Sequence, residues 1–217
     1  MNTTEAKRVL ETALICAPQP LSVRELGTLF DAEVSSDTLK TLLADLQLEW
    51  TGRGVELVPV ANPIGLAQRL DHKPMGRFEF DTAKNFNRHY PDMAAAGLAD
   101  AIPRMGTDAQ ANVATVRELV GEWLGDWLPA TELDSLRRQL LRLSHDADLV
   151  LDLHCDWEAV MHLYSEEACW PPLEPLARLL GCQAVLLARE SGGGPFDERL
   201  SGLGWQLATA LRAEGVN

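Results

Sequence analysis

The chain has 217 residues, 46% of them hydrophobic, which is enough for one ordinary domain or for a small domain followed by a larger one. Its net charge of −13 argues against sequence-independent binding to nucleic acid, because that affinity comes largely from lysine and arginine on phosphates. No apolar run approaches the roughly 20 residues that cross a bilayer, and the N-terminus has no apolar signal core, so we expect a cytoplasmic protein without a membrane segment.

The first 60 residues predict three short helices followed by a strand. Three segments that each contain a capping Ser or Thr and apolar residues at helical spacing are 4–17, 22–30 and 36–50. Glu25 follows Ser22 by three residues, which is the pattern of a capping box. The run 55-VELVPV then predicts a strand. This order is typical of a winged-helix domain.

The third predicted helix is poorly suited to read a DNA groove. It has one basic residue, Lys40, against Asp37, Asp45 and Glu49. A groove-reading helix normally directs Arg, Lys, Asn or Gln at the bases. Contact with a protein is therefore the better interpretation.

Residues 1–60 resemble the first winged-helix domain of segregation and condensation protein B, a bacterial condensin accessory subunit. The strings that carry the resemblance are 8-RVLETALICAPQPLSVRELGTLF, 38-TLKTLLADLQLEW and 52-GRGVELV. The resemblance implies a condensin-type protein partner for residues 1–60. The acidic third helix and the net charge predict no direct binding of nucleic acid.

From residue 55 onward the pattern changes to strands that alternate with helices. Near-continuous apolar runs predict strands at 55–60, 148–154 and 183–190. Helical spacing predicts helices at about 111–127, 131–144, 173–181 and 200–215. Strands of this kind separated by helices predict an α/β fold, here a partial parallel or mixed sheet with flanking helices, preceded by the small winged-helix α+β domain. We expect the domains to be 1–60 and 61–217.

His154 lies at the end of a predicted strand, in 152-DLHCD, where function collects in parallel sheets. A neutral imidazole is a common zinc ligand, and Asp152 or Asp156 could hold its second nitrogen. A histidine with a purely structural role is the alternative.

The string 85-NFNR, with Arg77 ahead of it, is the second candidate site. An Arg binds a carboxylate through two parallel hydrogen bonds, and an Asn adds its amide. The alternative is a loop-closing Asn with a surface ion pair.

In order along the chain, 58-VPVANPIGLAQR, 85-NFNRHYPD, 148-DLVLDLHCD and 186-LLARESGGGPFDE resemble the succinylglutamate desuccinylase/aspartoacylase family, relatives of zinc carboxypeptidases. The resemblance covers about 58–217. It implies zinc-dependent hydrolysis of an N-acyl amide in a small N-acyl amino acid-like substrate. It assigns His154 as the third zinc ligand and Asn87 with Arg88 as the carboxylate clamp, with Arg77 a looser match.

The resemblance also implies that the site is incomplete. The family's first two zinc ligands form an HxxE pair ahead of the position of 58-VPVANP, and none of the five histidines begins an HxxE. The catalytic Glu of the family lies on a strand beyond the last predicted helix, and Glu190 is a weak substitute. We therefore assign no catalytic residue and expect the deacylase-like domain to be truncated at both ends and inactive as this chain. Because both families could supply a strand like 55-VELVPVAN, we also hypothesise that the two parts are joined within residues 55–62.

Four cysteines without a CxxC spacing predict buried thiols and not a disulfide framework or thiolate zinc site. A third function, a DNA-binding regulator with a ligand-sensing domain, is disfavoured by the acidic third helix.

Overall fold

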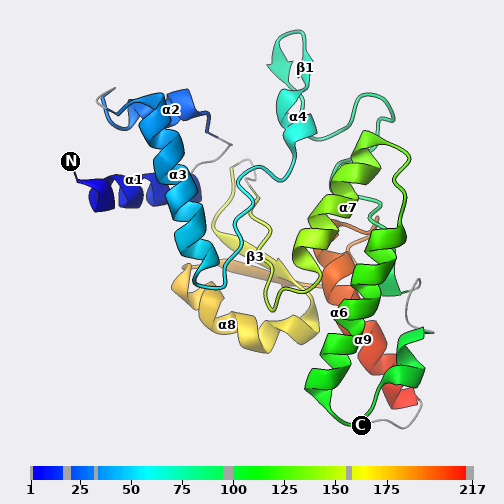
Figure 1. The fold of residues 1–217 in the computed structure, drawn as a ribbon. Coiled ribbons are helices and arrows are strands. Elements are labelled where there is room, and N and C mark those ends of the chain that lie inside the picture. The colour runs from blue at the N-terminus through cyan, green and yellow to red at the C-terminus, as the bar shows by residue number, and fades with distance from the viewer. Residues whose placement is uncertain (1, 17–20, 32–33, 95–99, 155–157, 214–217) are drawn as a thin grey trace. The chain divides into compact units, whose positions relative to one another are not determined.

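The computed structural model is mostly helical, with two small sheets, and describes residues 2–16, 21–31, 34–94, 100–154 and 158–213 (Figure 1). Its contacts divide the chain into two compact units, Met1–Leu66 and Ala67–Asn217. The assignment of a winged helix to 1–60 and of a deacylase-like domain to 61–217 stays a prediction. No helix in the described ranges has the length and hydrophobicity of a membrane span.

The first unit contains the three predicted helices, α1 (Thr3–Cys16), α2 (Val23–Thr28) and α3 (Ser36–Thr51), followed by a short α4 (Pro63–Ala67). The predicted capping box is confirmed, because the Ser22 hydroxyl accepts from Glu25 N and the Glu25 carboxylate accepts from Ser22 N. Helix α3 is capped by Ser35, one residue before the predicted Ser36.

The core of the first unit is a cluster of leucines contributed by all three helices. Leu10, Leu26 and Leu39 are at most 2% exposed. Each such side chain stabilises the unit by roughly 1.5 to 3 kcal/mol relative to an exposed position. The apolar stripes of the sequence therefore account for this unit.

The strand predicted at 55–60 is wrong. This segment has no strand geometry, and Val55, Leu57 and Val58 are each about 40% exposed. A strand needs a neighbour to satisfy its backbone groups, and the described residues pair only as β1 with β2 and β3 with β4, apart from an isolated bridge in the second unit.

The second unit begins with a small hairpin and continues with helices and one parallel strand pair. The hairpin is β1 (Arg69–Leu70) with β2 (Lys73–Pro74), and the later elements are η1 (Ile102–Arg104), α6 (Ala109–Asp126), α7 (Glu132–Ser144), β3 (His162–Ser165), η2 (Glu167–Cys169), α8 (Trp170–Leu179), β4 (Ala184–Leu187) and α9 (Phe196–Ala213).

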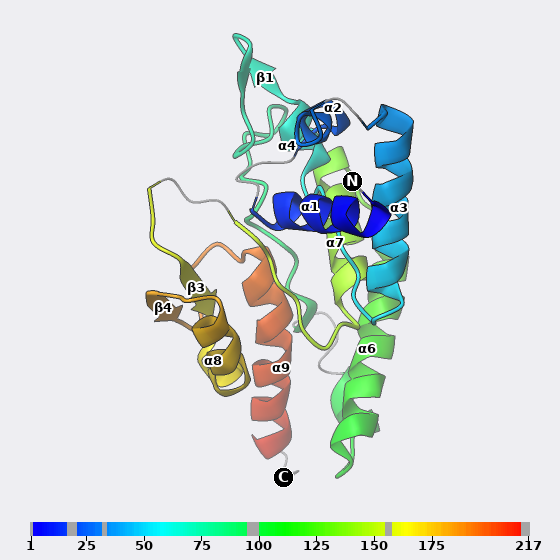
Figure 2. The same cartoon turned by 90° about the vertical axis from the view of Figure 1, so that its left-hand side faces the viewer.

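Strands β3 and β4 run parallel and are joined through α8, as Figure 2 shows. Their register pairs His162 with Ala184 and Ser165 with Leu187. The expected parallel sheet is present among the described residues only as this pair. The predicted strand at 183–190 is confirmed as β4, whereas β3 was not predicted and the predicted strand at 148–154 does not form.

The segment 148–154 is irregular and exposed, so the predicted buried strand is wrong here too. Leu149, Leu151 and Leu153 are 58%, 51% and 75% exposed. The alternation of a strand is present in the sequence, but no described strand lies beside it to complete a ladder.

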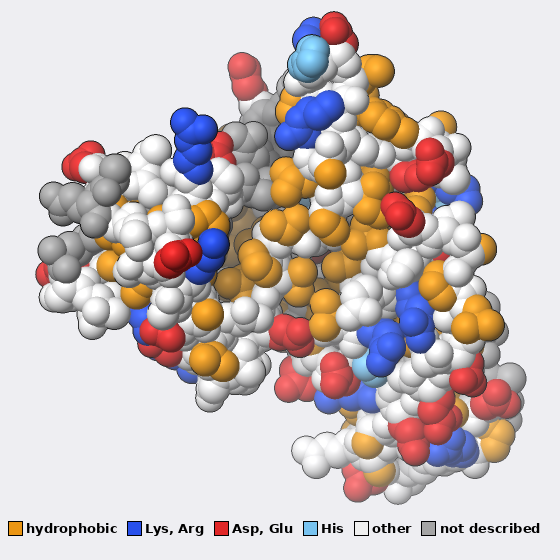
Figure 3. Space-filling view, turned by 45° about the horizontal axis from the view of Figure 1, so that its top comes forward, with side chains coloured by type: hydrophobic (Ala, Val, Ile, Leu, Met, Phe, Trp, Pro, Cys, Tyr) orange, Lys and Arg blue, Asp and Glu red, His pale blue; other side chains and the backbone are white. Residues whose placement is uncertain are grey.

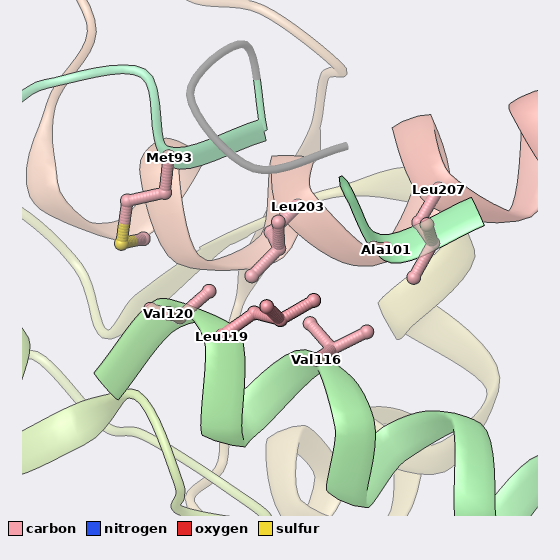
Figure 4. A pocket seen from close by; sticks show the side chains of 7 residues that line it. All are labelled: Met93, Ala101, Val116, Leu119, Val120, Leu203 and Leu207. Carbon is pink, nitrogen blue, oxygen red and sulfur yellow. The ribbon is translucent and has the colours of Figure 1, made fainter. Parts of the chain in front are cut away.

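Helices α6, α7 and α9 hold the core of the second unit, around the buried Leu124, Leu141 and Tyr90. A cavity of about 10 Å³ lies between α6, α9 and the segments around η1, no larger than one water molecule (Figure 4). Its lining is entirely apolar: Met93, Ala101, Val116, Leu119, Val120, Leu203 and Leu207. It is a packing defect of the core and not a ligand site.

Candidate functional site

The Asn-Arg string follows a short hairpin in the second unit. The backbone N–H of Phe86 donates to the carbonyl of Arg77 at 3.1 Å, Glu79 N donates to Lys84 O at 2.8 Å, and Phe78 and Asn85 form an antiparallel bridge. These bonds fix the backbone that enters the loop from Asn85 to Tyr90, which we call the clamp loop.

Asn87 connects the clamp loop to the start of α9. Its side-chain oxygen accepts from the backbone N–H of Phe196, the first residue of that helix, at 2.9 Å. This bond satisfies a donor that the first turn of a helix leaves unpaired, and it fixes which end of the amide is oxygen. The Asn87 NH₂ group, which is the end that could donate to a carboxylate, is not used in that bond.

Arg88 is half-buried and folds back on the loop. One Nη1 donor bonds the Asn87 carbonyl at 2.6 Å. No carboxylate among the described residues forms an ion pair with Arg88, and the bond to the Asn87 carbonyl uses one of its five N–H donors.

The glycine run after β4 packs directly against Arg88. A Cβ on Gly193 would lie 2.8 Å from Arg88 Cδ, and Gly193 has a φ of +80°. The Gly193 and Gly194 carbonyls accept from the backbone N–H groups of His89 and Tyr90 at 2.7 and 3.0 Å. Glycine is therefore favoured here by its positive φ and by the closeness of the Arg88 side chain, a role that the sequence did not reveal.

Two arginines that the sequence analysis did not single out hold the clamp loop. Arg137, on α7, is 2% exposed and donates from Nη2 to the carbonyls of Arg88 at 2.7 Å and Asn85 at 3.2 Å. Arg199, on α9, donates to the Tyr90 carbonyl at 3.2 Å and pairs with Asp92 at 3.0 Å. Arg137 could have been found, because it interrupts the buried stripe of Leu133 and Leu141 at helical spacing.

Arg77, the looser candidate, is exposed. Its guanidinium carbon lies 5.7 Å from the centroid of the Phe78 ring. Its backbone belongs to the hairpin that enters the clamp loop.

His154 is held by Asp152, one of the two carboxylates proposed for that task. Nε2 of His154 lies 2.8 Å from an Asp152 oxygen, and the His154 side chain is 57% exposed. Asp156 lies outside the described residues, as does Cys155. The bond to Asp152 orients the imidazole ring, which is what an outer carboxylate does for a metal-binding histidine.

The Asp152 carboxylate acts on the clamp loop and on α9. Burial raises the pKa of Asp197, at the start of α9, and the negative charge of Asp152 raises that pKa further. Although Asp197 is exposed by surface area, the surrounding protein displaces enough water to disfavour its charged form. Burial also raises the pKa of Tyr90, and the charge of Asp152 acts in the same direction.

The donor set does not fit a zinc site. Structural and catalytic zinc sites need at least three protein ligands, and no group of three His, Cys, Asp or Glu side chains in the described part of the chain is arranged to hold a metal. His154 with Asp152 supplies two side chains that already bond each other. The described residues thus contain the residues predicted for the clamp and His154, the predicted third ligand, without the HxxE pair that would supply the first two ligands.

Of the cysteines, Cys169 and Cys182 are free thiols, and burial raises the pKa of Cys169.

No protein-family model matches the chain. A 76-residue stretch is 34% identical to a segregation and condensation protein B homologue from Coxiella burnetii (strain RSA 493 / Nine Mile phase I), covering 34% of this chain and 36% of that protein. The predicted resemblance to that family is thus confirmed as a partial, weak similarity.

The fold is similar to that of solved structures, among them two from Shewanella species. One is a protein assigned to the succinylglutamate desuccinylase/aspartoacylase family from Shewanella amazonensis SB2B, with a TM-score of 0.62, 28% identity, and coverage of 78% of this chain and 48% of that chain. The other is a protein with the same assignment from Shewanella frigidimarina NCIMB 400, with a TM-score of 0.62, 25% identity, and coverage of 78% and 47%. The predicted resemblance to this family is confirmed, and the chain spans about half the length of the structures it matches.

Proposed function

We propose that the second unit binds the carboxylate of an N-acylated amino acid or a similar amide, as the carboxylate-binding part of a zinc deacylase-type fold. The observation that carries this proposal is the half-buried Arg88, which is fixed by its neighbours and forms no ion pair with a described residue. The structural match to proteins assigned to the succinylglutamate desuccinylase/aspartoacylase family supports it.

We also propose that this chain alone does not hydrolyse the substrate. Amide hydrolysis at zinc requires three protein ligands and one open position, and affinity for the metal comes from ligands acting together. Of the ligands expected from the resemblance, His154 is the one we assign. We therefore propose binding of the substrate class without turnover.

Isothermal titration of the whole chain with N-acetyl-L-aspartate and N2-succinyl-L-glutamate tests this proposal. We expect binding, and we expect Arg88→Met to weaken it by about tenfold or more, because hydrogen bonds between charged groups are each worth about 1.5 to 3 kcal/mol. Arg178→Met is the matched control, since Arg178 pairs with Glu174 on the exposed face of α8. It should bind like the wild type.

Two results would contradict the proposal. Equal binding by the wild type and the Arg88→Met variant would show that Arg88 does not bind the carboxylate. Stoichiometric zinc in the purified protein, together with hydrolysis that His154→Ala abolishes, would show that the chain is an enzyme after all.

A second candidate function belongs to the first unit, which we propose binds a condensin-type protein. The partial similarity to a segregation and condensation protein B homologue supports it. Helix α1 and the turn that follows α2 form an open groove, lined by Arg8, Val9, Thr12, Ala13 and Leu29. Binding of DNA by α3 is disfavoured, because its one basic residue, Lys40, already pairs with Asp37 and the helix also carries Asp45 and Glu49.

A pull-down of the kleisin subunit of a bacterial condensin by the whole chain tests this second function. Leu29 is 45% exposed in the groove, and Leu29→Glu should abolish capture by placing a charge on the apolar lining. Leu48→Glu is the control, because Leu48 is 71% exposed and does not line the groove. Absence of capture by the wild type, or equal capture by both variants, would refute the assignment.

A further inference from the structure

Arg137 lies buried against the clamp loop and touches it at two points. One nitrogen, Nη2, donates to the carbonyls of Asn85 and Arg88, which bracket Asn87. The guanidinium carbon also lies 5.7 Å from the Tyr90 ring, the last residue of the loop. A single planar group thus fixes both ends of the segment that carries the two clamp side chains.

This arrangement is an unfavourable way to fill a core position. Arg137 is 2% exposed, its nearest carboxylate is Asp134 at 3.4 Å, and its Nε has no hydrogen-bond partner. A buried charge with an unsatisfied donor destabilises the fold, and apolar side chains often replace buried ions without loss of stability. The neighbouring positions on the same stripe of α7 are the leucines 133 and 141. Packing alone therefore does not explain an arginine at this position.

The position of Arg137 also affects charge at the loop. Burial raises the pKa of Tyr90 and hydrogen bonding by Thr82 lowers the pKa of Glu79, and the Arg137 cation favours the ionised form of both. Glu79 lies in the hairpin that enters the clamp loop, where Thr82 N and the Thr82 hydroxyl both donate to its carboxylate. The buried cation thus adds positive potential beside the position where we place a substrate carboxylate.

We propose that Arg137 is a positioning residue, which holds the backbone of the clamp loop so that Asn87 and Arg88 are preset to receive a carboxylate. This inference rests on the proposed carboxylate binding and adds to it the residue that determines the geometry of the clamp. Preset donors bind more tightly because less conformational freedom is lost when the ligand arrives.

The neighbouring Arg138 provides a matched control. It lies on the same helix and also bonds two backbone carbonyls, those of Leu124 at 2.6 Å and Gly125 at 2.8 Å, at the end of α6. Arg138→Met therefore removes a comparable set of bonds from the same unit without touching the clamp loop. Any effect of lost stability alone should be common to both variants.

The test uses the whole chain in four forms: wild type, Arg137→Met, Arg137→Lys and Arg138→Met. Hydrogen exchange, read by NMR, is measured at the His89 and Tyr90 amides, which Gly193 and Gly194 protect. Titration with N-acetyl-L-aspartate gives the affinity. We expect Arg137→Met to raise exchange at both amides and to weaken binding about tenfold, as loss of an orienting partner does elsewhere. Arg138→Met should change the exchange rates and the affinity by no more than its loss of thermal stability explains.

Arg137→Lys separates geometry from charge. It keeps the cation but not the planar group that bridges two carbonyls. Weakened binding and raised exchange in this variant support positioning, whereas wild-type values would show that charge alone suffices and overturn the inference. If Arg88→Met weakens binding while Arg137→Met changes neither exchange nor affinity, the inference fails and the proposed function stands. If the wild type binds no carboxylate, both fail.

Discussion

Asp197 has an environment that opposes its negative charge. It lies in the first turn of α9, where backbone N–H groups stabilise a carboxylate, yet its pKa is raised. Burial is the main cause, and the negative charges of Asp152 and Glu198 add to it. Because Asp152 also holds His154, the Asp152 carboxylate connects the predicted ligand with the start of α9.

Replacement of Asp152 by Asn should lower the pKa of Asp197 part of the way toward its ordinary value. Removal of one negative charge favours ionisation, while the contribution of burial remains. The folded pKa of Asp197 is raised, so the stability that this group contributes is present below its unfolded pKa and lost as pH rises through the folded pKa. Titration of the Asp197 carboxyl carbon by NMR measures the change.

Asp148→Asn is the control for that titration, since Asp148 lies on the same segment and pairs with Arg117. It should leave the midpoint of Asp197 in place. If Asp152→Asn also leaves it in place, the electrostatic connection between Asp152 and α9 is wrong.

For single residues, the sequence identified the candidate side chains but did not predict most of the contacts that hold them. The strings around Asn87 and His154 pointed to both, and Asp152 could be named as a partner because it is two residues away. The bond from Phe196 to Asn87 and the bonds from Arg137 join residues about 50 to 110 positions apart in the chain. No local pattern reports such contacts.

Among the elements, helices whose ends carry local signals could be predicted closely. The Ser22 and Glu25 capping box lies where the sequence placed it, and Thr131, the first residue of the helix predicted at 131–144, accepts from Asp134 N as the cap of α7. These bonds join residues three apart and are each worth about 1 kcal/mol, so the sequence contains all of the information. Helices α6, α8 and α9 were predicted from the helical spacing of their apolar residues, with ends shifted by a few residues.

The strands show the opposite behaviour. The segments 55–60 and 148–154 have the apolar composition of strands but do not form them, whereas β3, with the polar and aromatic sequence His162 to Ser165, does. A strand exists only where a neighbour completes its hydrogen bonds, and β3 has β4 as its neighbour. Composition describes the side chains and does not supply the partner.

At the scale of the whole molecule, exposed apolar surface favours association between copies of the chain, and the net negative charge opposes it. Exposed hydrophobic side chains are visible on the face in Figure 3, and the segment 149–153 is among the exposed apolar stretches. Such a segment, with unpaired backbone groups, favours association with another chain. The net charge of −13 keeps copies apart at neutral pH and low salt.

Self-association should therefore increase when that repulsion is removed. We expect sedimentation velocity to show larger species in about 1 M salt, where the Debye length falls to about 3 Å, and near the isoelectric point of about pH 4.7. The double variant Leu151→Lys with Leu153→Lys should suppress the association, because charge on this exposed apolar segment opposes its contact with another chain. Both leucines are more than half exposed, so the free energy of unfolding should change by less than about 0.5 kcal/mol.

The control for this prediction is the double variant Leu48→Lys with Leu128→Lys. These positions are exposed and lie outside the segment 149–153, so this variant should associate like the wild type. Equal suppression by the two double variants would attribute the effect to net charge and not to the segment 149–153.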